Sequence, residues 1–158
     1  MPLAAAAPLV ESWAIHNRIH LYLLDAISPA GFAAKAGGKG RAVGTALAHV
    51  HNVRLMWLKS AAPELLAPLK KFESDTTPTA DEVRSALVAS GSAIAELVTS
   101  AVADGGRVKG FKPHVTAFVG YLIAHEAHHR GQITLALRLA GEPLEKTVAY
   151  GLWEWGSR

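Results

Sequence analysis

The segment from Val115 to Ala140, VTAFVGYLIAHEAHHRGQITLALRLA, decides how this 158-residue chain folds. Apolar residues recur through it at intervals of three and four, which is the spacing of one face of an α-helix. Pro113 stands at a position favoured in the first helical turn, and Gly141 is a typical helix stop. The segment therefore predicts a long, buried helix that the rest of the chain has to cover.

Three further segments have the same helical periodicity and supply that cover. The first runs from Val10 to Ile27, and the second runs from Ala42 to Ala61. The third opens with the capping box Thr79-Ala80-Asp81-Glu82 and continues to about Ala103. Because each amphipathic helix needs the others to bury its apolar stripe, we predict an all-α, up-down four-helix bundle.

The connections between these helices differ in length. Residues 30–41 are rich in glycine and predict a loop, but Ala33 and Gly40 break the Walker A pattern and Val43 breaks the dinucleotide fingerprint. Residues 70–78 form a long polar crossover between the second and third helices. The tail from Thr147 to Trp155 is too aromatic to be free, so we expect it to pack on the bundle. The whole chain, 1–158, reads as a single domain.

Composition excludes several functional classes. The chain has no cysteine, which rules out disulfides, iron–sulfur clusters and a thiolate nucleophile of its own. Its formal net charge is only +3, and the basic residues are scattered, so we expect no nucleic-acid partner. The N-terminal segment lacks the basic start of a signal peptide, and we expect no membrane span. The expected location is the cytoplasm.

The histidines carry the clearest chemical signal. Five of the eight lie in two clusters, His49-Val50-His51 and His125-Glu126-Ala127-His128-His129. Residues four apart share one helix face, so His125 and His129 can bind one metal ion together. Their stripe is otherwise largely apolar and should face the bundle interior. His16 and His20 have the same spacing, so spacing alone does not establish a site.

A third ligand must come from another helix. His49 shares a stripe with Thr45, Ala46, Val53 and Met56, whereas His51 points about 200° away and should meet solvent or pack near Arg54 and Leu55. We therefore expect His49 to complete the site. Three imidazoles leave a coordination position open for water or substrate.

Residues 125–129 also satisfy the HExxH pattern of zinc proteases, in which Glu126 would activate a water. That class needs a substrate-aligning strand and a downstream third ligand, and the chain predicts neither. With His125 and His129 facing inward, Glu126 projects about 100° aside, toward a neighbouring helix or a subunit contact. A metalloprotease is therefore disfavoured.

The chain resembles the DinB/YfiT-like superfamily of four-helix metal-binding bundles. The resemblance rests on Leu47-Ala48-His49-Val50, on His125 to Ile133 (HEAHHRGQI), and on Trp13 with Asn17-Arg18. It covers nearly the whole chain and implies a divalent ion bound by one histidine of the second helix and the histidine pair of the fourth. By motif these are His49, His125 and His129.

The resemblance implies a metal-dependent hydrolase, or a transferase or isomerase that uses a low-molecular-weight thiol, acting on a small molecule. The ion could be zinc, nickel, iron, cobalt or copper. Glu126, His128 and Tyr121 are candidates for supporting or proton-transfer roles around the ion. The alternative is a non-catalytic helical metal-binding or interaction protein. We also expect a homodimer, formed through the Trp153/Trp155 tail or a helix face.

Overall fold

The structure is a computed structural model that describes residues 2–38 and 40–158. Its fold is all-α, as the sequence predicts, and no strand is present in these two ranges. Four long helices account for most of the chain: α1 (Pro2–Asp25), α3 (Val43–Ala61), α5 (Ala80–Ala103) and α6 (Val115–Leu139). The shorter elements are α2 (Pro29–Ala33), η1 (Ala36–Gly38), α4 (Pro63–Leu66), α7 (Lys146–Gly151) and η2 (Trp155–Ser157).

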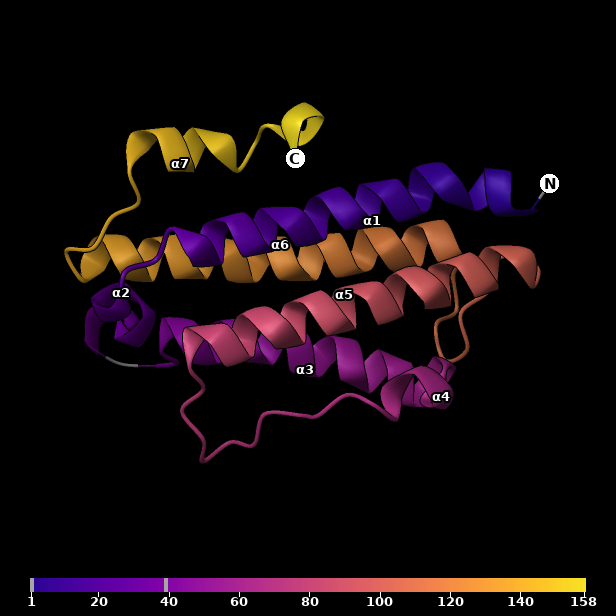
Figure 1. Cartoon of the computed structure of the whole chain (residues 1–158), viewed down its shortest axis with the longest axis horizontal. Coiled ribbons are helices and arrows are strands. Elements are labelled where there is room, and N and C mark those ends of the chain that lie inside the picture. The colour runs from indigo at the N-terminus through magenta and orange to yellow at the C-terminus, as the bar shows by residue number, and fades with distance from the viewer. Residues whose placement is uncertain (1, 39) are drawn as a thin grey trace.

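The four long helices pack side by side, and α1 and α6 run opposite to α3 and α5 (Figure 1). Leu47, early in α3, packs in one buried cluster with Leu87, early in α5, and with Leu137, late in α6. A second cluster joins Trp13 of α1 to Phe118, early in α6. The long crossover makes α3 and α5 parallel, so the helix directions do not alternate from one helix to the next as a simple up-down order would require.

Several element boundaries differ from the sequence predictions. The first helix begins at Pro2 rather than Val10, with Pro8 inside it. The predicted loop 30–41 contains α2 and η1, and Lys39 within it lies outside the described residues. The cap of α6 is His114, whose ring nitrogen Nδ1 accepts a hydrogen bond from the Ala117 amide, so Pro113 precedes the helix. The capping box of α5 is present as predicted.

A glycine allows α1 and α5 to approach closely beside the interior polar groups. A Cβ atom at Gly91 would lie 2.4 Å from Nδ2 of Asn17, which is closer than real contacts permit. The Gly91 carbonyl accepts a 2.8 Å hydrogen bond from the indole of Trp13. Gly91 thus fixes the separation of the two helices and holds Trp13 and Asn17 in the core.

Within the described ranges, α5 is the one helix long and apolar enough to cross a membrane. A core helix of a soluble protein meets the same criterion, and the apolar face of α5 is packed within the two core clusters. The length and composition of α5 are therefore accounted for by its place in the core.

Candidate metal site

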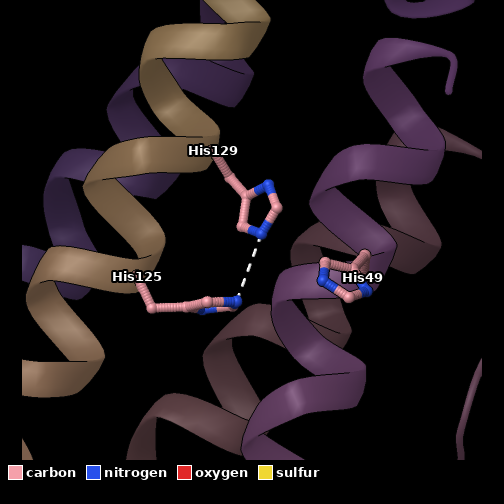
Figure 2. Close-up of side chains that lie close together, drawn as sticks. All are labelled: His49, His125 and His129. Atoms are coloured by element: carbon pink, nitrogen blue, oxygen red, sulfur yellow. Dashed lines mark hydrogen bonds between the residues drawn. The ribbon is translucent and has the colours of Figure 1, made fainter. Parts of the chain in front are cut away.

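Three imidazoles from two helices converge on one point. His49 projects from α3, and His125 and His129 project from successive turns of α6 toward it (Figure 2). One ring nitrogen from each lies within 4.8 Å of the other two. The ring centroid of His49 is 4.8 Å from that of His129 and 5.8 Å from that of His125. The structure thus brings together the three histidines that the sequence singled out.

The spacing of the nitrogens matches what one ion requires. Nε2 of His125 and Nε2 of His129 are 3.2 Å apart. Two ligands at about 2.05 Å from a tetrahedral ion would be separated by about 3.3 Å. Nδ1 of His129 lies 2.9 Å from the Gln132 side-chain oxygen, to which it can only donate, so Nε2 keeps its lone pair toward the shared point.

The site favours neutral imidazoles, which is the form that binds a metal. Burial lowers the pKa of His49 to about 4, and the charge of Arg41 and the neighbouring imidazoles contributes to the shift. Burial also lowers the pKa of His125 and of His129. A cluster of three neutral imidazoles presents lone pairs without mutual charge repulsion.

One cavity opens at His49 and a second opens at Gln132, whose side chain contacts His129. The first, of about 330 Å³, is lined by His49 and Asn52 of α3 and by part of the crossover, including Lys71. The second, of about 390 Å³, lies between the start of α3 and α6 and is lined by Gln132. Arg41 lines both cavities. A small molecule can therefore approach the histidines past a positively charged side chain.

The other candidate residues near the site have different positions. Tyr121 stacks beside His125, with ring centroids 6.3 Å apart, and is partly exposed. His128 is exposed, and its ring lies 5.4 Å from that of His129. His51 is buried rather than solvent-facing, with its two ring nitrogens 3.1 Å from the Ala86 carbonyl and 2.9 Å from the Lys70 carbonyl.

Glu126 does not face the three histidines. Its side chain is 1% exposed and contacts α1 and α3 in the interior. Arg54 donates to both carboxylate oxygens, and Nε2 of His16 and Nε2 of His20 lie 2.8 and 3.0 Å from Oε2. Glu126 thus faces neighbouring helices, one of the two directions expected for it, rather than a subunit contact, and its carboxylate is not placed to activate a water at the three histidines.

The sequence reading gave no role to Arg54, the residue that holds Glu126. Besides Glu126, its guanidinium contacts the Asn17 side chain, the Leu87 carbonyl and the Ser90 hydroxyl. The sequence does contain a signal that Arg54 is buried, because Arg54 lies seven residues after buried Leu47 and therefore on the same buried stripe of its helix. An arginine on such a stripe indicates a buried anionic partner.

His16, His20 and Glu126 form a second group that could hold a metal ion, with donor atoms within 4.8 Å of one another. In this group Glu126 is already bonded to Arg54, and Nη1 of Arg130 lies 3.2 Å from His16 Nδ1 and 3.1 Å from His20 Nε2. Two guanidinium groups at these donors oppose a further cation. Among the described residues, no guanidinium forms a hydrogen bond with His49, His125 or His129.

Comparison with known proteins places the whole chain in one group. The model of the DinB family matches residues 1–155. No curated protein and no solved structure matches the chain.

Proposed function

Because the chain belongs to the DinB family, we propose that it binds one divalent transition-metal ion through His49, His125 and His129 and is a metal-dependent enzyme. The observation that carries the proposal is that three imidazole rings, from two helices, each bring one ring nitrogen to within 4.8 Å of the other two. Three neutral imidazoles suit zinc, nickel or iron.

The residues present fit an ion with an open position. Three protein ligands are typical of catalytic sites, whereas structural zinc sites have four. No carboxylate or fourth histidine lies with the three within the described residues. A bound ion would supply Lewis acidity to a small molecule or to the sulfur of a low-molecular-weight thiol. The reaction that we propose is a hydrolysis or a thiol-dependent transfer or isomerisation, which are the classes that the family resemblance implies.

The protein itself contributes orientation and charge. Gln132 fixes the tautomer of His129, and the stacked ring of Tyr121 limits how His125 turns. Arg41, Lys71 and Glu73 are the charged residues that line the cavity at His49, which leaves an excess of positive charge, so we infer that the substrate is a small anion. Lys71 lies 3.4 Å from Glu73, whereas Arg41 has no salt bridge within the described ranges. Arg41 is therefore the stronger candidate to hold the substrate.

We further infer that the four long helices form one four-helix-bundle domain spanning 1–158, located in the cytoplasm. A homodimer stays a prediction.

The alternative function is a non-catalytic metal-binding protein. It is favoured if the metal binds but no thiol or small anion approaches it.

Metal content tests the site. The untagged protein should contain about one divalent ion per chain, and alanine at His49, His125 or His129 should each remove it. His51→Ala and His128→Ala are matched controls, one buried and one exposed, and should keep the ion if folded by circular dichroism. Undiminished metal in both His125→Ala and His129→Ala would contradict the site. Loss in His51→Ala alone would reverse the choice of the third ligand.

Activity tests the class of function. A cobalt-substituted protein should change its visible absorption when a low-molecular-weight thiol is added, or it should hydrolyse small anionic esters or amides. The Arg41→Met variant should weaken either response at least tenfold while keeping the metal. A metal-loaded protein whose spectrum responds to no thiol and that hydrolyses nothing in such a panel would favour the non-catalytic alternative.

A further inference from the structure

A cleft lies on the side of α6 that faces away from the histidines, between α6 and residues 143–155 of the C-terminal segment. Figure 1 shows α7 and the C-terminus on the opposite side of α6 and α1 from α3. Thr134, which lines the cleft, follows His125 by nine residues, a rotation of roughly 180° around the helix axis. The cleft is therefore separate from the proposed metal site.

The cleft has the size and lining of a small-molecule site. Its volume is about 550 Å³, larger than either of the cavities at His49 and Gln132. Ligand pockets are typically roughly 300–1,000 Å³ and mostly apolar. Here the apolar surface comes from Ile123 on α6 and from Leu144, Leu152, Trp153 and Trp155 on the C-terminal segment. Trp153 is 81% exposed, so a large aromatic surface stands open at the rim.

The charges that line the cleft have one sign. Arg130 and Arg138 line it, and no aspartate or glutamate does. In the part of the chain that the structure describes, neither arginine forms a salt bridge, and the hydrogen-bond contacts of the Arg130 guanidinium are with the rings of His16 and His20, through Nη1. The rest of that guanidinium has no partner there. A planar guanidinium pairs best with a carboxylate, through two parallel hydrogen bonds.

The floor of the cleft is open because residue 131 is glycine. A Cβ atom at Gly131 would meet nothing within 4 Å, although the residue has ordinary helical backbone angles. Gly120, on the same helix, is equally unobstructed but does not line the cleft. A larger side chain at 131 would therefore fill the space above the helix, and the same change at 120 provides a matched control.

We propose that this cleft binds a small amphipathic carboxylate, with its apolar body against Trp153 and Trp155 and its carboxylate on Arg130. The apolar lining favours a monoanion over a doubly charged phosphate, which costs more to remove from water. Binding at this site does not use the metal.

Calorimetric titration of the full, chelator-treated chain with octanoate tests the proposal, with octan-1-ol as the uncharged comparison. Octanoate should bind once per chain and at least tenfold more tightly than octan-1-ol. Gly131→Leu should abolish octanoate binding, and Gly120→Leu should leave it unchanged. Arg130→Gln should weaken octanoate binding at least tenfold. Because Arg130 also contacts two buried histidines, Arg138→Gln provides a second test away from the core. This variant should weaken octanoate binding about threefold.

Four results would overturn the proposal. The first is equal binding of octanoate and octan-1-ol, which would remove the role of Arg130. The second is undiminished binding in Gly131→Leu. The third is binding that requires added metal and disappears in His49→Ala, which would place the carboxylate on the ion. The fourth is a halving of molecular mass on adding octanoate, which would assign the cleft to a second copy of the chain.

Discussion

The guanidinium of Arg54 donates two hydrogen bonds of 2.7 Å to the carboxylate of Glu126, one to each oxygen, in the interior of the protein. Burial alone would raise the pKa of Glu126, but Arg54, the hydrogen bond from His16 and the nearby ring of His20 hold that pKa well below its ordinary value. Glu126 is therefore an ionised structural group. The side chain of the adjacent residue, His125, points in a different direction from the same helix turn, toward the proposed ion.

Removing Arg54 should destabilise the fold strongly. In Arg54→Met, Glu126 is left buried without its charged partner, which costs about 3–5 kcal/mol in comparable cases. Urea unfolding followed by circular dichroism measures the change. The matched control is Arg84→Met, because Arg84 and Asp25 form a 3.1 Å pair that is about half exposed. That change should cost only about 0–1 kcal/mol. Equal losses in the two variants would contradict a structural role for the buried pair.

Replacing Glu126 should leave metal binding intact. Glu126→Gln keeps the shape of the side chain, and among the described residues the Glu126 carboxylate forms no hydrogen bond with His49, His125 or His129. The folded fraction of this variant should therefore contain as much metal as the parent, with a lower urea midpoint. Loss of metal from a folded Glu126→Gln variant would show that the carboxylate reaches the ion.

Gln132 should tune metal affinity through His129. The Gln132 side-chain oxygen holds Nδ1 of His129 at 2.9 Å, and loss of such an outer partner typically weakens metal binding about 10–100-fold. Competition with a chelator measures this for Gln132→Ala. Gln132→Glu keeps the acceptor and should restore the affinity. If alanine and glutamate behave alike, the hydrogen bond does not orient His129.

Lowering the pH should destabilise the metal-free protein already above the pH range in which its carboxylates become protonated. Burial lowers the pKa of His20 to about 3 and also lowers the pKa of His16, whereas an unfolded histidine titrates near about 6.5. Below that pH the unfolded chain binds protons that the folded chain excludes, so stability falls as pH decreases. The thermal midpoint of chelator-treated protein should drop between pH 7.5 and 5. In His20→Gln the thermal midpoint should fall less steeply with decreasing pH. A midpoint of the parent protein that stays constant over this range would contradict histidines that are buried in their neutral form.

The homodimer stays a prediction, and three exposed apolar side chains are candidates for its interface. Trp153, Tyr150 and Leu139 are 81%, 64% and 59% exposed. The expectation that the whole aromatic tail packs on the bundle is wrong for Trp153. Light scattering at micromolar concentration should give twice the 16.7 kDa mass of one chain, and Leu139→Ser, which lies outside the cleft between α6 and the C-terminal segment, should shift it toward the monomer. A monomeric parent protein would refute the prediction.

Local sequence patterns were enough to predict the helices and to single out the three histidines that the fold brings together. Helical periodicity, the Thr79–Glu82 capping box and Gly141 are local signals, and they located α3, α5 and α6 to within two or three residues. The i,i+4 pair His125 and His129 is also local, because the geometry of one helix fixes which side chains share a face. His49 could be selected over His51 because the two point in different directions on α3.

Which polar groups meet in the interior depends on the packing of helices that are distant in sequence. Helix periodicity shows that the Glu126 side chain points away from the helix face that carries His125, but it does not show which helix packs against Glu126. Its partner Arg54 is 72 residues away in sequence, and His16 is 110 away. The antiparallel packing of α3 against α6 places Arg54 opposite Glu126. Pairing between distant segments depends on helix order and rotation, which no local spacing encodes, so the ion pair and the Arg130 cleft emerged only from the folded chain.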